Sequence, residues 1–268
     1  MKKFRISQIQ FQAKSTPEEN ADLLEKFFVK SKKFNPDLIC TPECSNIITN
    51  DKKHLFKYST YQDDCPIIDK AKNFSKKNKV NINIGSLLLK IKNKKKLVNR
   101  SVLINKMGKI QTIYDKIHLF DVNINNKENH RESHSFIKGN KLVSTVINGV
   151  KIGFSICYDL RFPNMYRHHA KKRVQIILIP AAFTVPTGKA HWEILIKARA
   201  IENSIFVVAT NMCGTHHSGR KTYGHSLVCD PWGKIINRGS SNSKIVNSVI
   251  DLREISKIRS KIPSIYND

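Results

Sequence analysis

The first apolar stretch of the chain, residues 4–11, is a candidate β-strand in which large apolar residues are separated by polar ones. A helix is predicted next, because Thr16 and Glu19 supply the N-cap and capping-box glutamate of a helical pattern at 21–34. A short apolar run then predicts a buried strand at 37–41. The chain therefore opens with a strand, a helix and a second strand.

Strand and helix patterns continue to alternate along the rest of the chain, with antiparallel hairpins between them. One hairpin is marked by the turn Asn148-Gly149. This order predicts mixed sheets covered by helices, an α/β layered architecture. The predicted elements are a helix at 61–77, strands at 80–88, 97–105 and 109–114, a loop at 122–140, a strand at 152–156, a helix from 163, a strand at 174–180, a helix at 190–203, and strands at 205–210, 224–229 and 234–238.

The length of 268 residues, 40% of them hydrophobic, is sufficient for a sizeable buried core. No change in composition marks a boundary, so we expect one domain over 1–268. No apolar run approaches the ~20 residues of a membrane span, and no N-terminal stretch resembles the core of a signal peptide. We therefore expect a soluble, cytoplasmic protein with no membrane partner.

The six cysteines do not form a disulfide framework in a chain of this length, and no C-x-x-C pair offers the spacing of a metal site. We expect them to be reduced thiols, most of them packed in the core, and we expect no bound metal.

The net charge of +26 raises the alternative of a nucleic-acid-binding protein, since a basic patch would attract the phosphate backbone. The lysines are scattered, however, and no zinc-finger pattern, RNP pattern or interleaved aromatic series accompanies them. A solvated basic surface is the favoured interpretation, and we do not expect nucleic acid as a partner.

Candidate chemistry centres on Cys157, where an apolar strand pattern ends and a polar segment leads into a helix. Such a turn presents a nucleophile beside backbone N–H groups and the positive end of a helix, which lowers the pKa of a thiol. The alternative for a single cysteine is a buried structural residue. Two other strand ends carry polar groups: Glu43 follows the strand at 37–41, and Lys116 follows the second strand of a hairpin. Alone, each would be read as a solvated surface residue.

Several segments together resemble the nitrilase, or carbon–nitrogen hydrolase, superfamily, and the resemblance runs from end to end. Within it the chain is similar to the Nit branch, and most similar to the deaminated glutathione amidases. The segments that carry the resemblance are Lys-Ile-His-Leu-Phe-Asp, Arg-Glu-Ser, Cys-Tyr-Asp-Leu-Arg-Phe-Pro, His-Trp-Glu-Ile-Leu, Ala-Arg-Ala-Ile-Glu-Asn and Tyr-Gly-His-Ser-Leu-Val. The resemblance implies a four-layer α–β–β–α sandwich with two mixed sheets, which forms a homodimer or a higher homo-oligomer.

The resemblance also implies roles for four polar residues in the hydrolysis of a linear amide. Cys157 would attack the amide carbonyl and form a thioester, and Glu43 would carry the proton between thiol, amine and water. Lys116 would be a fixed cation beside the thiolate and the oxyanion, with the backbone N–H of Tyr158 as a second oxyanion donor. Glu132 would orient the lysine. No organic cofactor is implied, and His118 and His191 are expected to be structural or lining residues.

The substrate is the least determined feature of the sequence. The segments 211–226 and 182–187 resemble the amidases that hydrolyse deaminated glutathione to 2-oxoglutarate and cysteinylglycine, more than the ω-amidases that act on short α-keto acid amides. Phe183 lies in the second segment and is a substrate-binding candidate. Arg220 with the adjacent lysine, and separately Arg161, are candidates for contacts with substrate carboxylates.

Two further classes remain as alternatives. A thiol-based redox sensor would need a resolving cysteine spaced near Cys157, and the sequence has none. A catalytically inactive scaffold with the same fold is possible, but all four polar positions are intact. The chain departs from the branch at 123–129, which lacks the usual Pro-Gly, and after Phe136, where Lys138-Gly139 replaces it. Both departures lie on the segment that carries Glu132.

Overall fold

The computed structural model describes residues 3–125 and 128–267 and contains two six-stranded sheets that lie face to face. The first sheet runs, in order, through β16 (Lys244–Asp251), β1 (Lys3–Gln10), β2 (Leu38–Cys40), β3 (Asn81–Lys90), β4 (Leu97–Ile104) and β5 (Ile110–Asp115). The second runs through β15 (Ile235–Arg238), β14 (Leu227–Cys229), β11 (Phe206–Asn211), β10 (Ile176–Ala181), β9 (Val150–Phe154) and β8 (Ser144–Ile147). Each sheet has three parallel strands in its middle and antiparallel strands at its edges, so both are mixed.

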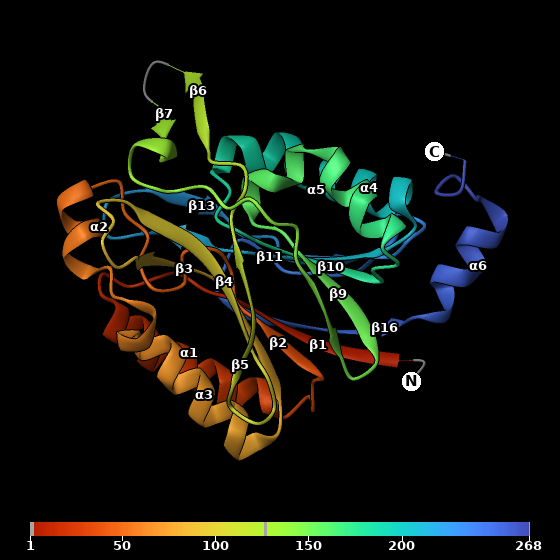
Figure 1. The fold of residues 1–268 in the computed structure, drawn as a ribbon, viewed down its shortest axis with the longest axis horizontal. Helices are drawn as coiled ribbons and strands as arrows, with labels where there is room; N and C mark the ends of the chain where they lie inside the picture. The colour runs from red at the N-terminus through yellow and green to blue at the C-terminus, as the bar shows by residue number, and fades with distance from the viewer. Residues whose placement is uncertain (1–2, 126–127, 268) are drawn as a thin grey trace.

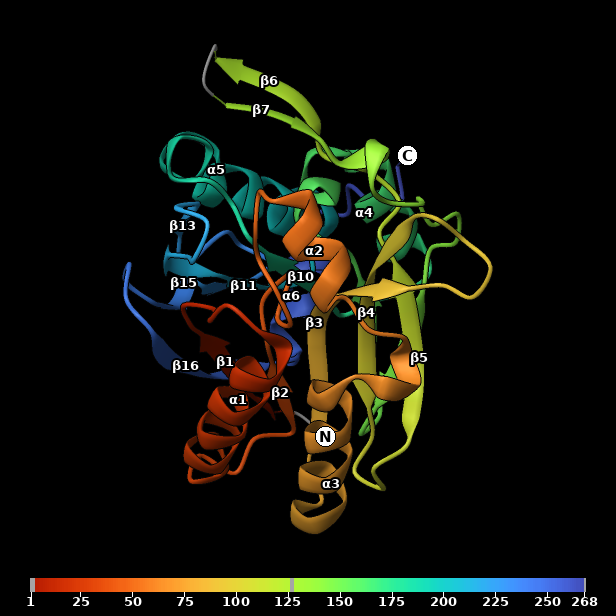
Figure 2. The same ribbon diagram turned by 90° about the vertical axis from the view of Figure 1, so that its left-hand side faces the viewer.

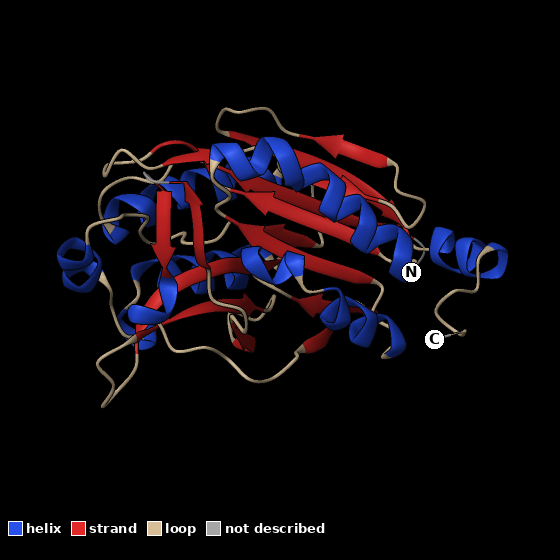
Figure 3. Ribbon diagram, turned by 90° about the horizontal axis from the view of Figure 1, so that it is seen from above, coloured by secondary structure: helices blue, strands red, loops and turns tan. Residues whose placement is uncertain are grey.

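Helices cover the outer face of each sheet (Figures 1 and 3). On the first sheet lie α1 (Pro17–Lys32) and α3 (Pro66–Asn78), and on the second lie α4 (Pro163–Lys171) and α5 (Val185–Asn203). The other two helices, α2 (Lys52–Tyr58) and α6 (Arg253–Lys261), lie at the ends of the sandwich (Figures 1 and 2). The layers are therefore α–β–β–α, and the predicted fold class is confirmed.

Local sequence explains where α1 begins and which face it buries. The side chain of Thr16 accepts a hydrogen bond from the backbone N–H of Glu19, and Glu19 reaches back to Thr16, which completes a capping box. Leu24 and Phe28, one turn apart, are fully buried against the first sheet. Burying each such side chain contributes about 1.5–3 kcal/mol, so the packed face holds this helix in place.

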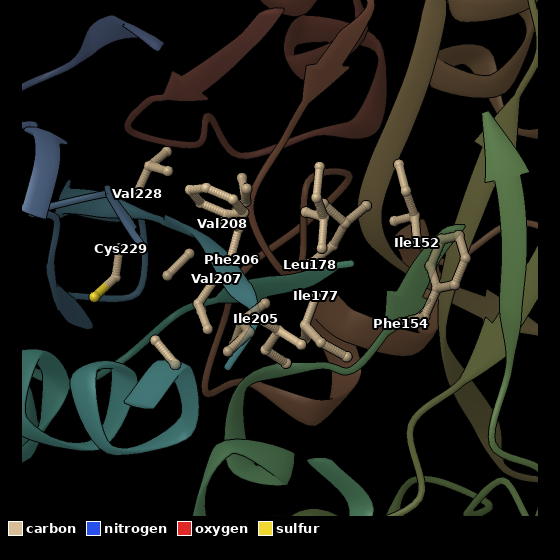
Figure 4. Close-up of a cluster of buried hydrophobic side chains, with 14 of the residues drawn as sticks. Ile152, Phe154, Ile177, Leu178, Ile205, Phe206, Val207, Val208, Val228 and Cys229 are labelled. Carbon is tan, nitrogen blue, oxygen red and sulfur yellow. The ribbon is translucent and has the colours of Figure 1, made fainter. Parts of the chain in front are cut away.

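The space between the sheets is filled by apolar side chains with few polar links. Figure 4 shows the cluster around β9, β10 and β11, where Phe154, Leu178 and Val208 are buried. Gln8 of β1 crosses this layer, and its Nε2 donates to the carbonyl oxygen of Ala209 on β11 at 2.8 Å. Because that amide is buried, the bond ties the two sheets together.

Several predicted elements have different bounds in the structure. The loop expected at 122–140 begins as a hairpin of β6 (Asp121–Asn125) and β7 (Glu128–Arg131). The sequence of β6 alternates polar and apolar residues, but that of β7 contains no apolar residue, so the pattern did not indicate a second strand. Residues 126–127 of that loop lie outside the described residues. The helix expected at 61–77 begins only at Pro66, and the one expected at 190–203 begins earlier, at Val185.

Other elements were not predicted at all. They are α2, α6, β16 and the short pair β12 (Cys213–Thr215) and β13 (Lys221–Tyr223).

Across the described residues, none of the helices combines the length and apolar composition that a membrane crossing requires.

Candidate active site

The polar residues that follow three strands converge on one region between the sheets. Glu43 follows β2 and Lys116 follows β5 of the first sheet, while Cys157 follows β9 of the second. All three are buried and line the same cavity. The structure thus brings together the residues that the sequence placed at separate strand ends.

Gly85 allows the chain before Glu43 to pass close to both sheets. A Cβ atom at this position would lie 1.9 Å from the carbonyl oxygen of Thr41 and 2.5 Å from Cβ of Pro180. Gly85 also lies at an irregularity in the pairing of β3 with β4, between Ile84 and Leu87. Any larger residue would push away the backbone that leads to Glu43.

Lys116 is held between two carboxylates. Its Nζ donates to Oε1 of Glu43 at 2.9 Å and to Oε2 of Glu132 at 2.8 Å. Glu132 stands at the start of a 3₁₀ turn after β7, and its Oε2 also accepts from the backbone N–H of Phe120 at 2.6 Å. These two bonds use two of the three ammonium hydrogens and leave one for another acceptor.

Two further groups hold the carboxylates, and the sequence analysis assigned a role to neither. The side-chain amide of Asn99 on β4 donates to Glu43 at 2.9 Å and to Glu132 at 3.2 Å. The backbone N–H of Ala182, just after β10, donates to Oε2 of Glu43 at 2.9 Å. The register of the β4–β5 hairpin pairs Arg100, the residue after Asn99, with Asp115, the residue before Lys116, so the position of Asn99 beside Lys116 could have been inferred from that register.

Cys157 opens a 3₁₀ helix, Cys157–Arg161, directly after β9. Its φ of 48° lies in the left-handed region, which costs a residue with a side chain about 1–2 kcal/mol. Buried Asp159 holds this turn, because its Oδ2 accepts from the backbone N–H of Ile156 at 2.8 Å and from the hydroxyl of Tyr114 at 2.6 Å. Its Oδ1 accepts from the backbone N–H of His118 at 3.0 Å. Asp159 thereby joins the Cys157 turn to the segment around Lys116.

Burial and charge together set the ionisation of the site. Burial by itself raises the pKa of Glu43, but the Lys116 ammonium and a hydrogen bond with Cys157 outweigh burial and hold that pKa below its usual range. Burial and the charge of Glu43 raise the pKa of the Cys157 thiol well above its usual range. Burial lowers the pKa of Lys116, yet Glu132 and Glu43 raise it well above its ordinary value. The resting site therefore contains a Glu43 carboxylate, a Lys116 ammonium and a protonated Cys157 thiol.

The expectation that the turn lowers the pKa of Cys157 is wrong for the resting site. The positive end of the 3₁₀ helix and Lys116 favour the thiolate, but the thiol is almost completely buried and next to an anionic carboxylate. Desolvation and the like charge outweigh the favourable groups. The Cys157 thiol is therefore protonated at rest.

The cavity has a volume of about 990 Å³ and is large enough for a peptide-like molecule. All eight residues that the sequence analysis selected line it, and they are Glu43, Lys116, Glu132, Cys157, Tyr158, Arg161, Phe183 and Arg220. Cys44 lines it too, although its spacing from Cys157 gave no indication of this. Among the described residues, no cluster of three His, Cys, Asp or Glu could hold a metal ion.

Two arginines, Arg161 and Arg220, also line this cavity, and each has its own contacts. The Arg161 guanidinium lies 5.9 Å from the ring centroid of Tyr158 and 5.7 Å from that of Phe183, and its Nη2 is 3.2 Å from Nδ1 of His191. Nη2 of Arg220 donates to the carbonyl oxygen of Ala182 at 3.3 Å, while its buried Nε has no hydrogen-bond partner within residues 3–125 and 128–267.

Comparisons with known proteins show which family and which proteins this chain is similar to. The family model described as carbon-nitrogen hydrolase matches residues 5–260. A deaminated glutathione amidase of Dictyostelium discoideum is 37% identical over 97% of this chain and 91% of that protein. Another, from Yersinia enterocolitica, is 30% identical over 100% of this chain and 94% of that protein.

Solved structures show the same fold. The crystal structure of the Caenorhabditis elegans NitFhit protein has a TM-score of 0.93 at 30% identity and covers 100% of this chain and 65% of that one. Saccharomyces cerevisiae Nit3, a member of branch 10 of the nitrilase superfamily, has a TM-score of 0.88 at 26% identity, with coverage of 98% and 95%.

Proposed function

The chain belongs to the carbon–nitrogen hydrolase family, and from this premise we propose that Cys157, Glu43, Lys116 and Glu132 hydrolyse deaminated glutathione to 2-oxoglutarate and cysteinylglycine. The protein is a cysteine-dependent amidase. The observation that carries the assignment of residues is the buried lysine shared by two carboxylates in the cavity of the cysteine.

The first half of the reaction forms a thioester. The Glu43 carboxylate takes the proton of the Cys157 thiol as the sulfur bonds to the amide carbon, and the C=O electron pair moves onto oxygen. The remaining hydrogen of Lys116 and the backbone N–H of Tyr158 would donate to this oxyanion, because N–H groups in a first helical turn have no partner within the helix. When the carbonyl re-forms, the C–N bond breaks and the protonated Glu43 donates its proton to the departing amine.

The second half consumes water. Glu43, again a carboxylate, removes a proton from a water molecule as its oxygen bonds to the thioester carbon. The tetrahedral intermediate uses the same two donors, and its collapse breaks the C–S bond. The thiolate regains the proton from Glu43, which restores the resting enzyme. Glu132 keeps Lys116 in place throughout, since its Oε2 accepts a second hydrogen bond from the ammonium.

The two arginines support the choice of substrate. Deaminated glutathione carries one carboxylate on its 2-oxo acid arm and another on its terminal glycine, whereas α-ketoglutaramate carries only the first. Arg161 stands four residues beyond the nucleophile, and we assign it to the 2-oxo acid carboxylate that both compounds share. Arg220, with Lys221 beside it, is assigned to the terminal carboxylate.

The test is a comparison of kcat/KM for deaminated glutathione and α-ketoglutaramate with purified protein. We expect a clear preference for deaminated glutathione. The variant Arg220→Gln should raise KM for that compound and leave α-ketoglutaramate nearly unchanged, while Arg161→Gln should raise KM for both. A preference for α-ketoglutaramate would instead support the ω-amidase alternative and leave the mechanism intact.

A homodimer or higher homo-oligomer is also proposed. Ile194 and Ile201 lie seven residues apart on one face of α5 and are 69% and 50% exposed, and Trp232 nearby is 57% exposed. Light scattering of the purified protein tests this. The cytoplasmic location, the absence of a cofactor and the single domain over 1–268 stay predictions.

A further inference from the structure

Asn99 makes contact with every member of the buried carboxylate–lysine group. Its Nδ2 donates to Oε1 of Glu43 and to Oε1 of Glu132, at 2.9 and 3.2 Å. Its backbone carbonyl oxygen accepts from the backbone N–H of Lys116 at 2.9 Å. One residue therefore holds the backbone of the lysine and both of the carboxylates that hold its ammonium.

The orientation of the Asn99 amide is specific to this task. The residue is 1% exposed, and its Oδ1 has no hydrogen-bond partner within the described part of the chain. Rotating the amide by half a turn would aim Oδ1 at two carboxylate oxygens, which repel it. The protein therefore leaves a buried acceptor unpaired so that both amide hydrogens face the carboxylates.

A neutral donor suits this position for electrostatic reasons. Two carboxylates and one ammonium leave the group with a net negative charge, which favours protonation of a carboxylate. Hydrogen bonds to the charged form lower a carboxyl pKa, and an amide supplies them without a further charge that would compete for Lys116. Asn99 does not line the cavity, so it acts on the reaction through Glu43 and Glu132 and not through the substrate.

We propose that Asn99 is a positioning residue that keeps Glu43 ionised and at a fixed distance from Glu132 across Lys116. This inference rests on the proposed function, in which Glu43 must be a carboxylate to take the thiol proton. Loss of the amide raises the pKa of Glu43, and the active form then appears only at higher pH.

The experiment compares pH profiles of kcat/KM for wild type, Asn99→Ala and Asn99→Thr, with Asn83→Ala as control. Asn83 is an asparagine of the same sheet with the same 1% exposure, and its Oδ1 accepts from Ser101 and contacts neither carboxylate. We expect Asn99→Ala to move the acid limb upward by about one pH unit or more, since a hydrogen bond to a charged group is worth roughly tenfold or more in an equilibrium. kcat should fall and KM change little.

Asn99→Thr retains one donor and should show a smaller shift, and it carries the test if the alanine variant does not fold. An unchanged acid limb in a folded Asn99 variant, or an equal shift in Asn83→Ala, would overturn the inference. A second readout, which does not depend on amide hydrolysis, is alkylation of Cys157 by iodoacetamide. Alkylation also requires Glu43 to take the thiol proton, so the acid limb of the alkylation rate should shift in the same way. If the acid limb of alkylation shifts in the Asn99 variants but the wild type hydrolyses neither amide, the proposed function alone is refuted.

Discussion

Nζ of Lys116 lies 2.9 Å from Oε1 of Glu43, although the two residues are 73 positions apart in the chain and follow different strands. Both are almost completely buried. The charge of one carboxylate normally raises the pKa of a neighbouring carboxyl group. The Lys116 ammonium, which is hydrogen-bonded to both Glu43 and Glu132, offsets that effect. The site can therefore hold a base that is ionised at rest beside a thiol that is not.

The two carboxylates should differ in what their loss does. Glu43→Gln keeps the shape of the side chain but removes the proton acceptor, so kcat should fall by about two to four orders of magnitude. Glu132→Gln still accepts a hydrogen bond from Lys116 and should retain more activity. Steady-state kinetics of both variants decides this, and a far larger loss in Glu132→Gln would reverse the assignment of roles.

Asp159 gives a prediction about the geometry of the nucleophile. In Asp159→Asn an amide group would face at least one of the donors of Tyr114, Ile156 and His118, leaving a buried donor without an acceptor. We expect a loss of about 1–3 kcal/mol in the free energy of unfolding and a lower kcat, because the Cys157 turn is released from the Lys116 segment. Denaturant unfolding and kinetics measure both effects.

The control for this change is Asp251→Asn. Asp251 pairs with the neighbouring Arg253 at the surface, and such pairs contribute little to stability. A variant at Asp159 that is as stable and as active as this control would show that the buried carboxylate does not organise the turn.

The sequence was sufficient to select several of the polar residues that meet in the cavity. Glu43, Lys116 and Cys157 end apolar runs, and the family resemblance then selects them from other strand ends. The contacts of Asp159, and those of Asn99 with the two carboxylates, join segments that meet only in the folded chain. For Asn99 the register of the β4–β5 hairpin indicated only that it lies beside Lys116.

The predictions for the pKa of the Cys157 thiol and for a loop at 122–140 were wrong because each feature depends on pairing or contact with another segment of the folded chain. The prediction for Cys157 used only the helix that follows it. The pKa of the thiol depends instead on burial and on Glu43, which follows a strand of the other sheet. The strands β6 and β7 pair through their backbones, and the sequence of β7 contains no apolar residue, so β6 has no recognisable partner in the sequence.

Acid should destabilise the fold through His169. Burial lowers its pKa from 6.5 to about 4, so the unfolded chain takes up a proton at this residue before the folded one does. Stability contributed by the neutral ring is complete above about pH 6.5 and is lost as the pH falls toward 4, by roughly 3 kcal/mol. The free energy of unfolding of His169→Phe should therefore depend less steeply on pH in this window. Equal slopes for variant and wild type would contradict the prediction.

The charge of +26 should act on encounter with an anionic substrate and not on a nucleic acid. Raising salt from low to physiological strength should lower kcat/KM for deaminated glutathione modestly, because screening weakens the attraction. Duplex DNA binding measured over the same salt range is the counter-test. Tight binding that weakens by orders of magnitude would support the nucleic-acid alternative.

The most direct test of the account is to follow the acyl group on Cys157. Wild type mixed with deaminated glutathione is quenched in acid during turnover, digested and analysed by mass spectrometry, with folded Cys157→Ala treated in parallel. We predict a 2-oxoglutaryl thioester on the peptide that contains Cys157, none on the peptides of the other five cysteines, and neither adduct nor turnover in Cys157→Ala. Full turnover by folded Cys157→Ala, or an acyl group on a different cysteine, would contradict the account.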